Sequence, residues 1–201
     1  MQRPTPLPEA LARALAWHAL IRTGGFDGST GGRALDGVPL VYVDKNPWGR
    51  HLDDPSVPRN ADEAEAFASL LDRIGRGSVR LAYSTVSFGE GTPRDGSPSA
   101  SLFALRGVIG FRLSGLSLIQ HDERADTEAT AEFLYRSHGI SGYDAIHAAA
   151  SLLEGAWYFV TGDDRLRRRL SAMYEDWSLP AQAETPVTMI RRLDRGALIE
   201  D

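Results

Sequence analysis

The sequence of residues 140–166 is ISGYDAIHAAASLLEGAWYFVTGDDRL, and it contains the clearest structural pattern in the chain. Residues 143–153 are apolar on almost every side of a helix, which is typical of a buried helix. The run Trp-Tyr-Phe-Val at 157–160 predicts a buried strand, and the turn Thr-Gly-Asp-Asp at 161–164 precedes another helical segment. A buried helix, a buried strand and a further helix in succession indicate an α/β protein.

The same alternation of strand and helix extends through the chain. Residues 40–43, Leu-Val-Tyr-Val, predict a buried strand that ends at Asp44, and Asn60 is placed to cap a helix that continues to residue 74. The elements expected next are a strand at 79–83, a helix at 102–111, a strand at 116–120 and a helix at 125–137. Alternating strands and helices form parallel sheets covered by helices on both faces. The sequence therefore predicts a three-layer α/β/α fold with a mostly parallel central sheet.

A separate helix is expected before this domain. Residues 8–22 place Leu11, Leu15 and Ala19 on one helical face. Residues 23–37, TGGFDGSTGGRALDG, are rich in Gly, Ser and Asp, as is typical of a connection. We therefore expect an N-terminal helical extension at residues 1–38 and the main domain at residues 39–201.

The composition argues against several classes of protein. A chain of 201 residues, 42% hydrophobic and 24% charged, has the make-up of one ordinary soluble domain. No run approaches the roughly 18 apolar residues that a membrane span needs, and the N-terminus lacks the pattern of a signal peptide. The chain has no cysteine, which excludes disulfides and thiolate metal sites and fits a cytoplasmic location.

The net charge of −5 argues mildly against a nucleic-acid partner, because proteins that neutralise phosphates usually carry a basic excess. Acids gathered around a metal would account for part of this charge. Basic residues are also concentrated locally, at 165–169 (Arg-Leu-Arg-Arg-Arg) and at 191–192. Such a run is commonly a solvated helix face, but Arg165 lies close enough to Asp163 in the sequence to meet a phosphate.

Three aspartates lie where ligands bind in parallel α/β sheets. Asp44 follows the first strand, Asp163 follows the strand at 157–160, and Asp144 begins the buried helix before that strand. Ligands in such folds bind outside the carboxyl ends of the strands. Converging acids repel one another unless a cation lies between them, and an oxygen-rich site without sulfur suits Mg²⁺ or Mn²⁺.

Four segments carry a resemblance to a known family. The stretches VYVDKN, GYDAIHAAAS, WYFVTGDDRL and ETPVTMIRRL resemble the successive sequence blocks of PIN-domain ribonucleases, a family that includes many toxins of bacterial toxin–antitoxin pairs. The resemblance covers residues 39–195 and is dense in 140–166. It implies a PIN-like fold and a metal-dependent endoribonuclease.

The resemblance also implies a set of site residues. The metal ligands would be Asp44, Asp144 and Asp163, with Thr161 orienting a water or a carboxylate. The family's remaining acid would fall on Glu90, and Asp164 is the other candidate to complete the metal shell.

The chain departs from the family pattern at the fourth acid. Glu90 is followed by Gly91 and Pro93, so the usual helix cannot continue directly from it, and Asp95 is a possible substitute.

The function expected from this resemblance is cleavage of RNA with Mg²⁺ or Mn²⁺, and Arg165 and Arg168 are the candidate phosphate-binding residues. RNA, a small antitoxin protein and a second copy of the chain are the expected partners. The alternative is a catalytically weak or inactive PIN-fold protein that serves as an interaction or RNA-binding module. A different Mg²⁺-dependent phosphate enzyme would need a second acid soon after the first strand, which Asp44-Lys45-Asn46 does not supply.

Each candidate site residue also has a purely structural explanation. Ser141 and Asp144 have the spacing of a capping box, and so do Thr161 and Asp164, which leaves Asp163 unexplained by capping. Asp44 at a strand end has the position of a turn residue. His147 lies one helical turn after Asp144 and could approach the acids, but a histidine on a buried helix is usually a packed and hydrogen-bonded core residue.

Overall fold

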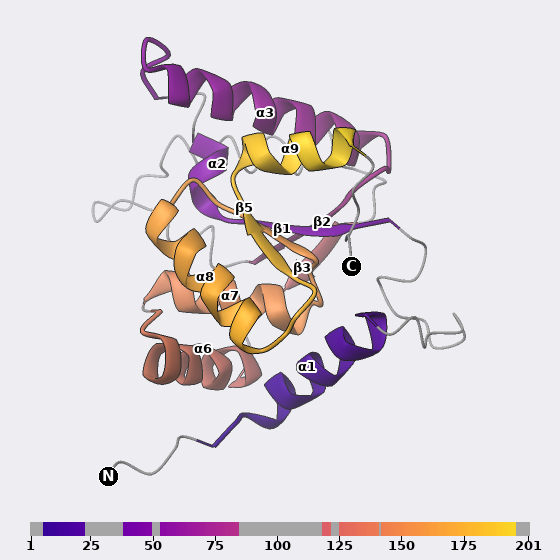
Figure 1. Ribbon diagram of the computed structural model, residues 1–201, viewed down its shortest axis with the longest axis vertical. Coiled ribbons are helices and arrows are strands. Elements are labelled where there is room, and N and C mark those ends of the chain that lie inside the picture. The colour runs from indigo at the N-terminus through magenta and orange to yellow at the C-terminus, as the bar shows by residue number, and fades with distance from the viewer. Residues whose placement is uncertain are drawn as a thin grey trace.

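The computed structural model describes residues 6–22, 38–49, 53–84, 118–121, 125–140 and 142–195. Figure 1 shows their arrangement. The helices are α1 (Glu9–Arg22), α2 (Lys45–Gly49), α3 (Pro58–Gly75), α6 (Ala125–His138), α7 (Tyr143–Leu153), α8 (Asp164–Asp176) and α9 (Pro186–Asp194). The strands are β1 (Leu40–Val43), β2 (Arg80–Ser84), β3 (Leu118–His121), β4 (Tyr158–Val160) and β5 (Gln182–Glu184).

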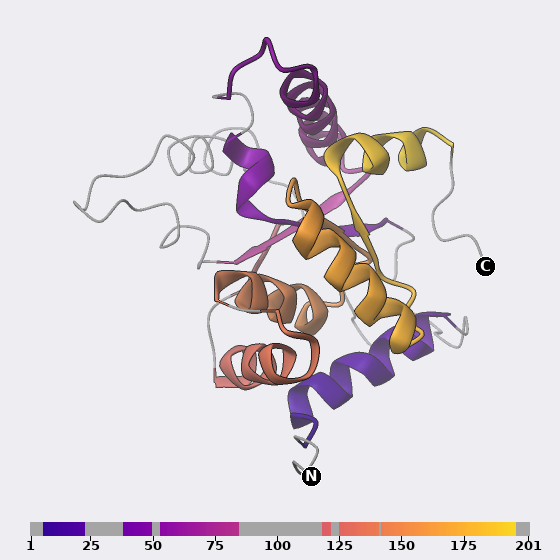
Figure 2. The ribbon, with the colours of Figure 1, turned by 60° about the vertical axis from the view of Figure 1, so that its left-hand side comes forward.

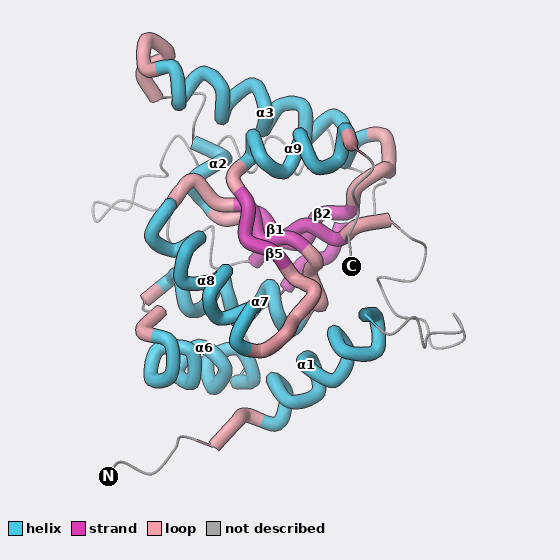
Figure 3. Tube along the Cα trace, in the orientation of Figure 1, coloured by secondary structure: helices cyan, strands magenta, loops and turns pink. Residues whose placement is uncertain are grey.

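The five strands form one sheet in the order β3-β2-β1-β4-β5, and every neighbouring pair is parallel. The sheet lies at the centre of the molecule, where Figure 3 draws it in magenta between cyan helices. In register, Tyr42 of β1 lies beside Ala82 of β2 and Phe159 of β4. The α/β class and the parallel central sheet predicted from the sequence are confirmed.

Helices cover both faces of the sheet, which Figure 2 shows from the side. Alternate residues along a strand point to opposite faces, so β1, β2 and β4 each contribute to two hydrophobic clusters. One cluster joins Leu40, Tyr42, Ala82 and Phe159 to apolar residues of α1, α6, α7 and α8. The other joins Val41, Val43, Leu81 and Val160 to Trp48 of α2 and to α3 and α9. The predicted three layers are therefore present.

Helix α1 packs directly on the main domain. Leu11 is fully buried in the same cluster as the residues of α7, and His18 is also fully buried. Trp17 lies so close to Gly155 that a Cβ atom there would meet the indole Nε1 at 3.1 Å. The predicted helix at 8–22 is confirmed, and it contributes to the core of the domain that follows it.

Two helix starts differ from the sequence prediction. The helix expected to begin at Asn60 begins at Pro58, after Val57, because the fixed φ of a proline suits the first helical position. The Asn60 side chain donates instead to the backbone oxygen of Asp54. Helix α7 begins after Gly142, at φ 61°, one residue later than a cap at Ser141 would place it. Ser141 itself lies outside the described residues, so the capping box expected for Ser141 and Asp144 stays a prediction. Asp144 is the second residue of this helix.

The third strand occupies 118–121, two residues beyond the predicted start. The helix predicted at 102–111 lies outside the described residues. Among the described helices, none has the length and apolar character that crossing a membrane requires.

Candidate functional site at the carboxyl ends of β1 and β4

The order of the strands reverses between β1 and β4. From β1 the chain proceeds to β2 and β3 on one side, and from β4 it proceeds to β5 on the other. The segment after β1 leads to α2 and α3 on one face of the sheet, whereas the segment after β4 leads to α8 on the opposite face. Ligands of open α/β sheets bind at such a switch point, outside the carboxyl ends of the strands. Asp44 and Thr161 are the residues that follow β1 and β4 there.

Asp44 is only 3% exposed, and its carboxylate is held by hydrogen bonds. Oδ1 accepts from the backbone N–H of Lys45 at 2.6 Å, and Oδ2 accepts from the hydroxyl of Thr161 at 2.7 Å. The backbone N–H of Asp44 donates to the oxygen of Val160 at 2.9 Å. A local turn explains only the bond to Lys45. The bond to Thr161 joins the ends of two neighbouring strands.

Thr161 connects Asp44 to the start of α8. Its fully buried hydroxyl donates to Asp44 and accepts from the backbone N–H of Asp163 at 3.0 Å. Its own backbone N–H donates to the oxygen of Glu184 at the end of β5, at 3.0 Å. One side chain thus fixes the carboxylate after β1 relative to the turn after β4.

Asp163 is the N-cap of α8. Its Oδ1 accepts from the backbone N–H groups of Arg165 at 2.7 Å and Leu166 at 3.0 Å. The capping box predicted for Thr161 and Asp164 is therefore wrong. The Thr161 hydroxyl is engaged by Asp44 and by the Asp163 backbone, so the helix starts three residues after it, at Asp164, with Asp163 as the capping residue.

Asp164 is paired with basic residues. Its Oδ2 accepts from Arg59 at 2.9 Å, and its Oδ1 lies 3.5 Å from Arg167. Desolvation acts to raise the pKa of Asp164, but the charges and hydrogen bonds of Arg59 and Arg167 outweigh it and hold the pKa below its ordinary value. The structure places Asp164 in an ion-pair network on the turn.

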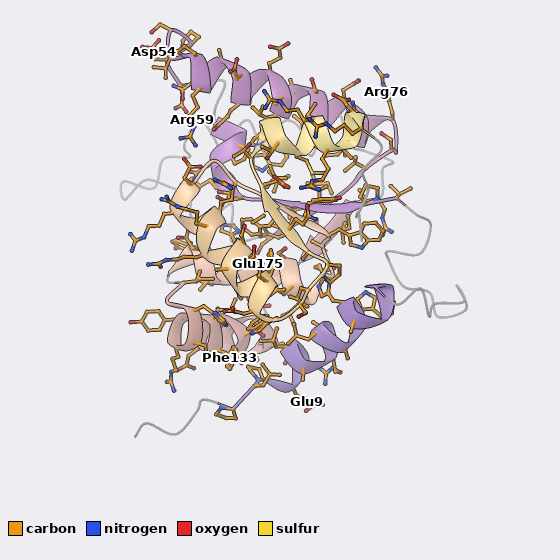
Figure 4. The ribbon with its side chains drawn as sticks, in the orientation of Figure 1. Glu9, Asp54, Arg59, Arg76, Phe133 and Glu175 are labelled. Carbon is orange, nitrogen blue, oxygen red and sulfur yellow. The ribbon has the colours of Figure 1, made fainter. Side chains whose placement is uncertain are left out.

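Arg59 ties the start of α3 to the same turn. Figure 4 labels it at that end of α3, near α8. Its Nη2 donates to the oxygen of Gly162 at 3.0 Å, and its Nε donates to the buried carboxylate of Glu63 at 2.7 Å. The hydrogen bond to Glu63 is the largest of the effects that raise the pKa of Arg59. No sequence pattern indicated this role, because the turn that Arg59 contacts lies more than one hundred residues later.

His147 is fully buried, as its position on an apolar helix predicted, and it also lies beside the site. Its Nδ1 is 2.7 Å from the hydroxyl of Tyr42, and its Nε2 is 3.9 Å from Oδ1 of Asp44. Tyr42 stacks on Phe159 and lies two residues before Asp44, hence on the same face of β1. Asp144 is half-buried and lies one helical turn before His147.

The predicted phosphate-binding residues lie on α8. Arg165 and Arg168 are both exposed, and the Nε of Arg168 donates to the backbone oxygen of Asp164 at 3.2 Å. Both arginines lie within two turns of the Asp163 cap, so their charges are near the switch point.

The chemistry of the acids fits Mg²⁺ or Mn²⁺, but the described acids do not assemble into a three-ligand cluster. Asp44 and Asp163 supply hard oxygen donors at the switch point, with Asp144 at the start of α7. Because Mg²⁺ usually keeps several waters and binds through one or two carboxylates, this donor set suits it. Glu90 and Asp95, the candidates for a further acid, lie outside the described residues.

No protein-family model matches the sequence, and no curated protein matches it. The structure itself establishes an α/β protein with a parallel sheet.

Proposed function

We propose that this protein is a Mg²⁺- or Mn²⁺-dependent endoribonuclease of PIN type. The observation that carries the proposal is the hydrogen bond between Asp44 and Thr161, which joins the carboxyl ends of β1 and β4. It fixes a buried carboxylate at the point of the sheet where ligands bind, next to the turn that carries Asp163. The resemblance of residues 39–195 to PIN-domain ribonucleases supports the same function.

Each residue of the site has a task in this proposal. Asp44, Asp144 and Asp163 would hold the metal, with Glu90 or Asp164 completing its shell. When bound, the metal would supply electrostatic stabilisation to the phosphodiester and lower the pKa of water. Thr161 keeps the Asp44 carboxylate in one orientation through its 2.7 Å bond. The exposed Arg165 and Arg168 would bind the phosphates of RNA.

The biological role proposed with this chemistry is that of a toxin held in check by a small antitoxin protein, which would place it in the cytoplasm. A second copy of the chain is a further proposed partner. These partners follow from the resemblance to PIN-domain toxins.

A second candidate function is a PIN-fold module that binds RNA or protein without cutting. Two observations favour it. The described residues contain no cluster of three acids or histidines, and the net charge of −5 opposes RNA binding at a metal-free site. This candidate predicts that any ligand is bound and released unchanged.

The experiment that separates the two functions uses the purified full chain with labelled single-stranded and structured RNA, in Mg²⁺, Mn²⁺ or EDTA. We expect cleavage that depends on the metal and falls at least about 100-fold in Asp44→Asn. The matched control is Asp72→Asn, which changes an exposed aspartate of α3 that pairs with the exposed Arg76. If the wild-type protein binds RNA but cuts none of it with either metal, the endoribonuclease proposal is wrong and the non-catalytic function replaces it.

A further inference from the structure

Two buried side chains, Tyr42 and His147, lie directly behind Asp44 and have no role in the proposed function so far. Tyr42 belongs to the hydrophobic cluster on the face of the sheet that α7 covers, and His147 is a fully buried residue of α7. The Tyr42 hydroxyl is 2.7 Å from Nδ1 of His147, and Nε2 of the same ring is 3.9 Å from Oδ1 of Asp44. The imidazole therefore lies between the Tyr42 hydroxyl and the Asp44 carboxylate.

The surroundings of the imidazole favour one position for its ring hydrogen. A carboxylate oxygen is an acceptor only, so the nitrogen that faces it is favoured as N–H. We therefore expect Nε2 to carry the hydrogen, which lets Nδ1 accept from the Tyr42 hydroxyl across the 2.7 Å contact. The ring is held in place by this bond and by edge contact with Tyr42, whose own ring stacks on Phe159.

We propose that Tyr42 and His147 are positioning residues for Asp44 in its role as a metal ligand, an inference that rests on the proposed function. Two donors, Lys45 and Thr161, already hold one oxygen each. At 3.9 Å the imidazole is beyond direct hydrogen-bond range, so it acts by presenting a polar N–H to Oδ1 and by blocking rotation of the carboxylate toward α7. Partners behind a ligating side chain commonly change metal affinity by about 10–100-fold.

The test measures Mn²⁺ binding by the full chain with isothermal titration calorimetry. His147→Leu removes the N–H and should weaken binding by about 10–100-fold. His147→Gln can present an amide N–H near the same place and should restore most of the affinity. Tyr42→Phe removes only the hydroxyl and should weaken binding less than His147→Leu does.

The matched control is Tyr174→Phe. Tyr174 is also a buried tyrosine of the same hydrophobic cluster, and its hydroxyl bonds to Ser151. Tyr174 lies near the end of α8 that is opposite to the Asp163 cap. Removing the Tyr174 hydroxyl should therefore leave the affinity for Mn²⁺ unchanged. A loss of affinity equal to that of Tyr42→Phe would overturn the positioning role, since it would show a general effect on the core.

A second measurement does not involve the metal. Nitrogen-15 spectra of the histidine side chains, assigned with His147→Gln, should show hydrogen on Nε2 in the wild type and a redistribution in Tyr42→Phe. Hydrogen on Nδ1 in the wild type would overturn the inference. Mn²⁺ binding by His147→Leu at wild-type affinity would also overturn it and leave the proposed function standing. A wild type that does not bind Mn²⁺ would overturn both.

Discussion

Replacing Asp163 separates a role in metal binding from a role in capping α8. The carboxylate accepts two backbone hydrogen bonds, at 2.7 and 3.0 Å, at the start of a 13-residue helix. Asp163→Ala removes both bonds and the negative charge. Asp163→Ser removes the charge but keeps an oxygen that caps a helix about as well as aspartate.

The expected losses follow from these contacts. Losing the cap costs about 1 kcal/mol, and losing the charge at the helix N-terminus costs about 0.3–1 kcal/mol more. A protein of this size loses about 2–4 °C in Tm for each kcal/mol. Asp163→Ala should therefore lower Tm by about 3–8 °C, and Asp163→Ser by about 1–4 °C. Thermal unfolding followed by circular dichroism measures both.

RNA cleavage then gives the second half of the comparison. If Asp163 is a metal ligand, both variants should lose at least about 100-fold in cleavage rate at 25 °C, where both are folded. A Ser variant that cuts at the wild-type rate, beside an Ala variant with a lower Tm, would show that Asp163 is only a cap. Equal Tm values for all three proteins would refute the capping argument.

Three further predictions concern stability. Thr161→Val removes a buried hydroxyl with two hydrogen bonds and should lower the free energy of unfolding, measured in urea, by about 1–3 kcal/mol. Thr161→Ser keeps the hydroxyl and should retain most of that free energy. Equal losses in the two variants would contradict the role of the hydroxyl. Gly155 and Gly139 both have positive φ, 71° and 66°, but a Cβ atom would meet Trp17 only at Gly155. Gly155→Ala should therefore lower Tm more than Gly139→Ala, and equal losses of Tm would contradict the contact between Trp17 and Gly155. Burial lowers the pKa of His18 below 6.5, so the folded state binds a proton less readily than the unfolded chain and stability falls as the pH drops below about 6.5. His18→Leu should reduce the slope of unfolding free energy against pH by at most about 1.4 kcal/mol per pH unit. Urea titrations at pH 5–7 measure this slope, and an unchanged slope would refute the role of His18.

The sequence predicted the strands and the long helices because their signals are local. Buried strands such as β1 and β4 are short uninterrupted apolar runs, and α7 is apolar on nearly every side. The position of Asp44 at a strand end followed from the same runs. The alternation of these elements was enough to predict a parallel sheet with helices on both faces.

The sequence failed where a side chain has a choice of partners. Thr161 has the spacing of a capping residue, but its hydroxyl bonds to Asp44, which lies far away in the chain, and Asp163 takes over the cap. Arg59 and Tyr42 join the site through contacts with residues more than one hundred positions away. Such contacts exist only after the sheet has formed, so no local pattern indicates them.

The packing of α1 against α7 has a consequence for synthesis of the chain. Trp17 leaves the ribosome about 140 residues before Gly155, its neighbour in the folded protein. At about 5–20 residues per second, α1 waits roughly 7–30 s for the surface that covers it. During this time Leu11, fully buried in the finished protein, has no α7 to pack against. A chain that stalls before α7 would therefore present an apolar helix to other nascent chains and to chaperones.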